Sequence, residues 1–311
     1  MPKITELLKL KKMKKITLIT IIIAATISGA LFAIKNKGED QPQSRIISLS
    51  KDSDKKDAEE KKTENKNINQ VLPVSPISGV ASENGDRRPF AVMLAADEST
   101  RPISGIGQAD LVVEMPVIKN GINRFMAVYI TKSPEDIGSV RSARHDFIPL
   151  AQGLNAIYAH WGGSHFALDE LNKKIIDDLD ALPNLFDAFY RKKGVSAPDN
   201  GFTSMEKMFS ASENLGYALK NDRRAENFIS ESEWEPESEG WVYFGENVLV
   251  NYPGKGKVEW KFDSQENKYF RFRGEKPEID KNTGEQVSAK VVALLAVKSR
   301  VLEGQYNDVD I

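Results

Sequence analysis

The amino-acid sequence predicts an α+β fold, with a mixed sheet-and-helix domain over residues 73–228 followed by a small, mostly antiparallel β domain over residues 229–311. Short apolar or β-branched runs, bounded by Gly, Pro, Asn and Asp, recur from Pro73 onward and are typical of strands. Amphipathic runs at helical spacing lie between and after these strands. Because the two kinds of run do not alternate regularly, the pattern favours α+β over a βαβ arrangement.

The bulk composition excludes several classes of function. The chain has 311 residues, and its 43 basic and 45 acidic side chains give a net charge of −2. A nucleic-acid-binding protein usually carries a basic excess, so this balance argues against one. The chain has no cysteine, which excludes disulfides, thiolate catalysis and cysteine-ligated zinc.

The N-terminal region carries an apolar segment over residues 16–34 without a single charge. A helix of that length is roughly 28 Å long, close to the hydrocarbon core of a bilayer. Six lysines and one acid precede it. The positive-inside rule therefore predicts a cytoplasmic segment over residues 1–15, one transmembrane helix over residues 16–34, and folded domains outside the cytoplasm.

Two other interpretations of this segment stay open. The small residues Ser28, Gly29 and Ala30 could form the cleavage site of a signal peptide. The segment could also be a buried helix of the core. A lipid anchor on cysteine is excluded, because the chain has none.

Residues 35–72 are charged and contain no aromatic side chain. Such a segment buries too little apolar surface to offset the conformational entropy that folding removes. We therefore expect a disordered spacer between the membrane and the folded domains.

The elements of the first domain follow from its apolar runs. Thr203 and Glu206 have the spacing of a capping box at the start of the last helix. The predicted strands are 90–95, 111–117, 125–131 and 156–161, and the predicted helices are 142–152, 165–182 and one that starts near Ser204.

The second domain shows strand alternation. Residues 257–262 and 269–273 each place apolar and charged side chains on opposite faces, which predicts an antiparallel hairpin with one face in water. Residues 248–251 and 291–297 are further strands. The last of these is apolar on both faces, and few residues follow it, so we expect this second sheet to be incomplete.

A glycine-rich turn joins a predicted strand to a predicted helix at Gly162, Gly163 and Ser164. Glycines ahead of a helix N-terminus let backbone N–H groups converge on an anion. The same residues also fit a plain turn in which Ser164 caps the helix.

Arg141 and Arg144 are three residues apart and would share one face of a helix. Two neighbouring guanidinium groups repel each other unless they meet carboxylates or phosphates. They could hold an anionic ligand, or they could form salt bridges with acids of the same domain.

All three histidines lie close together in the sequence, at His145, His160 and His165. With Asp146 or Asp169 they could contribute to a metal site. Their spacing matches no standard ligand pattern, so we expect neither a metal nor a cofactor.

Glu114 is a weak candidate for a general acid, and a structural ion pair with Arg124 across a hairpin is the alternative. The sequence contains no nucleophile elbow, phosphate loop, zinc helix or dinucleotide fingerprint. No reaction is therefore specified by a motif.

Six stretches of the first domain form a recognisable set: RRPFAVML (87–94), RPISGIGQADLVVE (101–114), NGINRFMAVY (120–129), IGSVRSAR (137–144), AIYAHWGGS (156–164) and APDNGFTS (197–204). In this order they resemble the YerB-like lipoprotein family, domain of unknown function 3048. The resemblance implies a two-domain envelope protein, anchored at the outer leaflet of the membrane and without a settled activity. It also favours a shared functional cleft made of Arg141, Arg144, His160, Gly162, Gly163, Ser164 and Asn200.

The chain departs from the family pattern in three respects. The lipidated cysteine is missing, so the apolar segment must supply the anchor. Asp199 stands where the family has a histidine before Asn200, so no role of that histidine carries over. Family members also continue beyond the strand that ends near Arg300, which puts the completeness of the second domain in doubt.

We therefore expect a membrane-anchored extracytoplasmic protein that binds an anionic envelope component, such as a wall polymer, or a partner protein in cell-wall metabolism. A hydrolase or lyase acting on wall polymer, with Glu114 or Asp199 as the acid, is the alternative. A purely structural envelope scaffold is the third interpretation.

Overall fold

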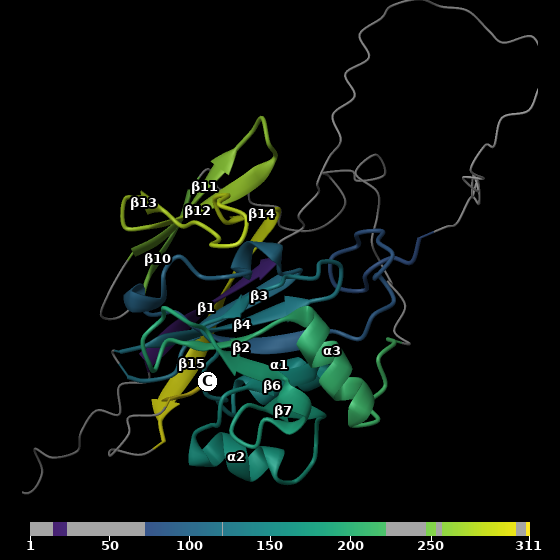
Figure 1. Cartoon of the computed structure of the whole chain (residues 1–311). Helices are drawn as coiled ribbons and strands as arrows, with labels where there is room; N and C mark the ends of the chain where they lie inside the picture. Colours follow the sequence, from purple (N-terminus) through teal and green to yellow (C-terminus); the bar gives the residue numbers. More distant parts are fainter. Residues whose placement is uncertain (1–14, 24–71, 120, 222–246, 253–256, 303–308) are drawn as a thin grey trace, which may run out of the picture. The chain divides into compact units, whose positions relative to one another are not determined.

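The structure is a computed structural model that describes residues 15–23, 72–119, 121–221, 247–252, 257–302 and 309–311 (Figure 1). Residues 15–23 and the described part of 72–311 belong to one compact unit. The predicted cytoplasmic segment before Lys15, and the predicted spacer up to residue 71, lie outside the described residues.

A mixed sheet of eight strands forms the centre of this unit, and the described residues confirm the predicted α+β class. The strands follow the order β16-β15-β1-β3-β4-β2-β6-β7. β2 pairs with β6 and β6 with β7 in parallel, and the other neighbours are antiparallel. The bounds are β1 Lys15–Ile23, β2 Phe90–Ala95, β3 Leu111–Pro116, β4 Asn123–Tyr129, β6 Ile157–His160, β7 Asp178–Asp180, β15 Val291–Val301 and β16 Val309–Asp310.

The central strands are apolar on both faces because both faces are covered. Every residue of β2 and β3 is buried. Val92 and Leu94 belong to one hydrophobic cluster, whereas Ala91 and Met93 belong to another. Strands buried on two sides read as continuous apolar runs, which is why the sequence identifies them.

The N-terminal apolar segment differs from the prediction. Its described part is β1, which lies between β15 and β3 and pairs antiparallel with both (Figure 1). None of the helices in the described ranges is long and apolar enough to span a membrane. The run ITLITIII is rich in β-branched residues, and these suit the interior of a sheet as well as they suit lipid. Residues 24–34 lie outside the described part.

Three short helices accompany the large sheet: α1 Phe147–Gly153, α2 His165–Leu171 and α3 Met205–Asn214. The predicted helix 165–182 is wrong beyond Leu171, because Lys174 takes a left-handed conformation (φ 53°) and β7 follows. The predicted capping box is also wrong. Ser204, not Thr203, caps α3, and its Oγ accepts a hydrogen bond from the N–H of Lys207 at 3.1 Å.

Two smaller sheets and three 3₁₀ turns complete the described structure. The predicted hairpin is confirmed as the pair β11–β12 of the five-stranded antiparallel sheet. Residues 291–297 do form a strand, but it belongs to the large sheet as β15. The five-stranded sheet holds β10 Asn247–Asn251, β11 Lys257–Asp263, β12 Lys268–Arg273, β13 Lys276–Pro277 and β14 Ser288–Ala289; the three-stranded sheet holds β5 Ile137–Gly138, β8 Phe189–Arg191 and β9 Gly201–Thr203; the 3₁₀ turns are Glu98–Thr100, Ile106–Gln108 and Leu185–Asp187.

A buried ion network joins the large sheet to the five-stranded one. Arg271 of β12 is fully buried, and its Nη2 donates to Glu114 of β3 at 2.9 Å. Its Nε donates to Glu278 at 2.5 Å, and Arg101 lies 3.0 Å from the other oxygen of Glu278. Two arginines and two glutamates therefore neutralise one another where water is excluded.

Candidate functional site

The segments that hold the two predicted arginines and the glycine turn lie side by side. The N–H of Ala143 donates to the carbonyl of Gly162 at 2.8 Å, and the N–H of Ser164 donates to that of Ala143 at 3.2 Å. The N–H of Trp161 donates to the carbonyl of Arg141 at 3.0 Å. The predicted proximity is therefore present. However, Arg141 and Arg144 precede α1, so they do not share a helix face.

The N–H groups of Gly162 and Ser164 in the glycine turn are used within the protein. The N–H of Gly162 donates to Asp180 Oδ1 at 2.8 Å. Ser164 caps α2, with its Oγ accepting from the N–H of Ala167 at 3.3 Å. A Cβ on Gly163 would lie 3.1 Å from Leu168, so this glycine permits close packing of the turn. These contacts describe a capped strand-to-helix turn, and α2 is too short to present an anion site of its own.

Arg141 is held by groups of the same fold. Its Nη2 forms an ion pair with Asp199, and its Nη1 donates to the carbonyl of Pro198 at 2.8 Å and to Ser139 Oγ at 2.5 Å. Asp199 is therefore the partner of an arginine and not an isolated acid. The neighbouring Asn200 accepts a hydrogen bond from Arg191 Nη1 at 2.7 Å.

A third arginine, which sequence reasoning missed, belongs to this neighbourhood. Arg124 is a mostly buried residue of β4, and it forms an ion pair with Asp97 at 3.4 Å. Burial lowers the pKa of Arg124 to about 10; Asp97 opposes this effect, whereas the positive charges of Arg144 and Arg141 add to it. We call Arg124, Arg141 and Arg144 the arginine cluster. Two contacts with β2 bring these segments together. Arg124 pairs with Ala95 at the end of β2, and the N–H of Arg141 donates to the carbonyl of Met93 in the same strand.

His160 has a structural role in β6. Its ring is buried, with Nδ1 2.9 Å from the carbonyl of Gly162 and Nε2 3.4 Å from Asp178. His165 is exposed at the first position of α2. His145 lies with Asp146 and, from the far end of the sequence, Asp310.

Glu114 is fully buried, and its carboxylate accepts hydrogen bonds from Arg271 and from Asn123 Nδ2 at 3.0 Å. The predicted ion pair with Arg124 is wrong. The register pairs Glu114 with Phe125 and Met115 with Arg124, which places Glu114 and Arg124 on opposite faces of the sheet. A buried carboxylate that is already paired cannot reach a polymer in solvent.

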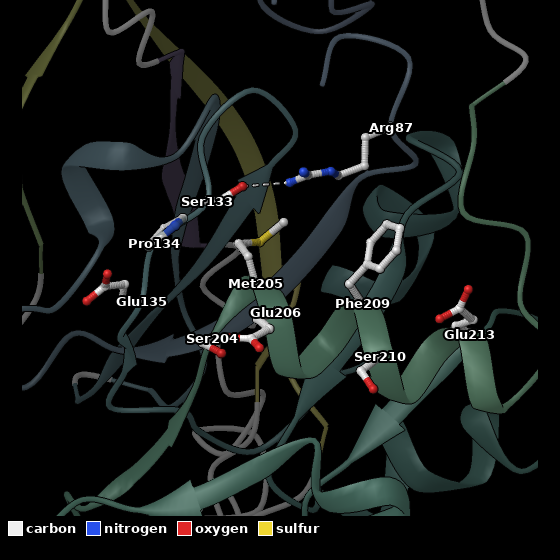
Figure 2. A pocket seen from close by; sticks show the side chains of 10 residues that line it. All are labelled: Arg87, Ser133, Pro134, Glu135, Ser204, Met205, Glu206, Phe209, Ser210 and Glu213. Carbon is white, nitrogen blue, oxygen red and sulfur yellow. Dashed lines mark hydrogen bonds between the residues drawn. The ribbon is translucent and has the colours of Figure 1, made fainter. Parts of the chain in front are cut away.

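Two cavities are prominent in the described structure, and neither is lined by Arg141, Arg144 or Gly163. The first, of about 660 Å³, lies along α3 (Figure 2). Figure 2 shows Arg87 reaching over it to Ser133 Oγ, at 3.1 Å. The second, of about 860 Å³, is lined by His145, Asp310 and residues of α1 and α2.

Comparison with known proteins gives a consistent match. The family described as "Protein of unknown function (DUF3048) N-terminal domain" matches residues 77–218, and the corresponding C-terminal domain matches residues 248–311. The chain is 29% identical over 234 residues to "Putative lipoprotein YerB" of Bacillus subtilis, covering 74% of this chain and 69% of that protein. The crystal structure of YerB from Bacillus subtilis superposes with a TM-score of 0.60 at 30% identity, over 69% of this chain and 71% of that one.

Proposed function

Because the chain belongs to the family of proteins with the DUF3048 N-terminal and C-terminal domains, we propose that it is an extracytoplasmic envelope protein held at the membrane. The proposal is supported by the relative from Bacillus subtilis, which is described as a "Putative lipoprotein". This chain has no cysteine to lipidate, so its apolar segment 16–34 is the proposed single-pass anchor, with residues 1–15 in the cytoplasm.

The same residues cannot form a membrane-spanning helix and strand β1 at the same time. The backbone groups of residues 15–23 bond to β15 and β3 in the structure. In a bilayer the same groups must bond to one another in a helix, because lipid offers no hydrogen-bond partners. The anchored protein therefore lacks β1, and the edge of β3 beside it is open.

External protease tests the proposed topology. Protease added to intact protoplasts is expected to cut within residues 35–71 and to release the folded part from the membrane fraction. Before proteolysis, a high-salt wash should leave the protein membrane-bound, because burial in lipid is not a charge interaction. A cytoplasmic marker protein serves as the control. Protection of the folded part under conditions that spare the marker would refute the orientation.

The activity that we propose is the binding of an anionic envelope component, either a wall polymer or an acidic surface of a partner in wall metabolism. The arginine cluster carries this proposal. The positive charges of Arg144 and Arg141 contribute to lowering the pKa of Arg124 there, while Asp97 pairs with Arg124 and Asp199 pairs with Arg141. An anion bound at the cluster would offset the repulsion that Arg144 and Arg141 exert on Arg124.

The alternatives receive less support from the geometry. A hydrolase that uses two carboxylates needs both of them open to the sugar. Glu114 is buried under Arg271, and Asp199 is paired with Arg141. No observation favours a reaction at either residue. The pairing of Arg141 does fit a structural scaffold, so the experiment must separate binding from scaffolding at Arg144.

Anion-dependent stability separates these two roles. Sulfate or phosphate is expected to raise the free energy of unfolding of the wild-type chain by about 2.7 kcal/mol at a hundredfold excess over its Kd. Arg144→Gln keeps the start of the aliphatic stem and a hydrogen-bond donor but removes the charge, so this gain should disappear. Lys173→Ala removes an exposed cation that pairs with Glu170 on α2, and it should keep the gain.

Thermal unfolding with and without anion, at constant ionic strength, measures the effect for all three proteins. Chloride at the same ionic strength controls for general screening. An equal anion-dependent shift in wild type and Arg144→Gln would make the arginine cluster structural and would remove the basis of the binding proposal.

A further inference from the structure

His145, Asp146 and Asp310 form a group that the sequence does not bring together. His145 and Asp146 immediately precede α1, whereas Asp310 lies in β16. One ligand atom from each residue lies within 4.8 Å of the others. The imidazole Nε2 is 3.3 Å from Asp146 Oδ1 and 3.5 Å from Asp310 Oδ1. Both carboxylates thus approach the same ring nitrogen.

These distances are too long for good N–H···O hydrogen bonds, which measure about 2.7–3.2 Å. Both ring nitrogens of His145 are shielded from solvent, and neither has a hydrogen-bond partner in the described part of the chain. The ring is held by packing, with its centroid 5.7 Å from that of Phe166. A hydrogen bond to the imidazole therefore does not explain the arrangement, although Asp146 Oδ1 also accepts from the N–H of Ile311 at 3.3 Å.

Metal coordination does explain the distances. Zinc binds imidazole nitrogen and carboxylate oxygen at about 2.0–2.2 Å in tetrahedral geometry, so two of its ligand atoms lie roughly 3.3–3.5 Å apart. The two measured separations from Nε2 have this length. Each carboxylate oxygen thus lies at the distance from Nε2 that two ligands of one zinc ion would have.

The charge of the group also favours a cation. Two carboxyl groups face one imidazole, and two carboxylates that share a site repel each other. Arg300 pairs with Oδ2 of Asp310, the oxygen that does not approach His145, at 2.6 Å from the Arg300 Nε. The side chain of Arg300 is 76% exposed. Oδ1 of Asp310 remains directed at His145. A divalent ion between the three groups would offset the repulsion.

We propose that His145, Asp146 and Asp310 bind a divalent transition-metal ion of the zinc type, with a fourth position directed toward the second cavity. The imidazole favours such an ion over magnesium or calcium, which prefer oxygen ligands. His145 and Asp310 line the cavity of about 860 Å³, together with Arg300 and Lys173. The fourth ligand would therefore be water or an oxygen of an anionic ligand in this cavity. This proposal does not depend on the arginine cluster.

Zinc alone is the probe. The full chain, purified in mild detergent and stripped with a chelator, is expected to bind one Zn²⁺ per chain in equilibrium dialysis followed by metal analysis. At a hundredfold excess over Kd, the midpoint of thermal unfolding should rise by about 5–10 °C. Mg²⁺ at the same concentration should produce no such rise.

Matched variants locate the site. Asp310→Asn and His145→Gln are each expected to weaken zinc binding about 100-fold, because each removes one of three ligands. Asp169→Asn changes an acid that lines the same cavity, and His165→Gln changes an exposed histidine, so both should bind zinc as the wild type does. Melting without metal confirms that each variant folds. The proposal is overturned if the wild type binds no zinc, or if Asp310→Asn and His145→Gln bind it with wild-type affinity.

Discussion

Replacing Arg271 with methionine is expected to lower the free energy of unfolding by about 3–5 kcal/mol, because it leaves Glu114 buried without its cation and Glu278 with Arg101 alone. Arg271 is fully buried, and its guanidinium lies 5.3 Å from the ring centre of Trp260 and 5.4 Å from that of Phe125. Methionine fills most of this space. The loss therefore measures the unpaired charges and not a cavity.

The pH dependence of this loss provides a second test. Burial alone would raise the pKa of Glu278, but Arg271 and Arg101 overcome that effect and hold the pKa below its usual value. The stabilisation from Glu278 is therefore present above the carboxyl pKa of the unfolded chain and is lost as the pH falls through the folded value. Without Arg271 the carboxyl group of Glu278 takes up a proton more readily, so the difference between variant and wild type should shrink below about pH 5.

Denaturant unfolding at several pH values measures both effects. Glu114→Gln in the Arg271→Met background should recover part of the stability, because it removes one of the unpaired charges. Lys220→Met is the control. This substitution removes a solvent-exposed ion pair in which Lys220 Nζ lies 2.8 Å from Asp86 Oδ2, and it should cause no resolvable change in the free energy of unfolding. A loss below 1 kcal/mol for Arg271→Met would show that the network is open to water.

Residues 230–311, produced alone, are expected not to fold. Arg271 would lose its partner Glu114, and β15 would lose the sheet in which it pairs. Val258 and Trp260 also belong to a hydrophobic cluster that includes Val92 of β2. The isolated segment would keep only a small sheet, whose apolar core is shared with the other region.

Circular dichroism and amide-proton dispersion test this prediction. The expected result is no cooperative thermal transition, together with concentration-dependent association. Val291, Leu294 and Leu295 are already exposed in β15, and an unpaired apolar strand promotes edge-to-edge association. The full chain under identical conditions is the control. Cooperative unfolding of residues 230–311 as a monomer would show that the family's C-terminal domain is independent of the N-terminal one.

Sequence patterns predicted the parts of the fold that local physics decides. β2 is a continuous apolar run because both its faces are buried, β3 departs from such a run only at Glu114, and residues 257–262 alternate because one face of their sheet meets water. Ser164 caps α2 because a serine hydroxyl can satisfy an N–H of the first turn. In each case the cause lies within a few residues of its effect.

Predictions that depended on strand register or on distant residues were less successful. The partner of Glu114 is decided by the register of β3 and β4, and it proved to be Arg271, more than 150 positions away. The approach of Asp310 to His145 has no local signal either. The apolar run at residues 16–23 was ambiguous for another reason, because lipid and a sheet interior select the same β-branched side chains.

The place of β1 between β15 and β3 has a consequence for biosynthesis. Ile23 pairs with Val291, so a ribosome that adds about 5–20 residues per second needs roughly 15–50 s to produce the partner strand after β1 has emerged. Contacts between residues so distant in sequence also form slowly. During that interval the nascent apolar segment has no strand of β15 to pair with. Under the proposed anchoring, the order of synthesis would therefore let the bilayer take up this segment before β15 exists.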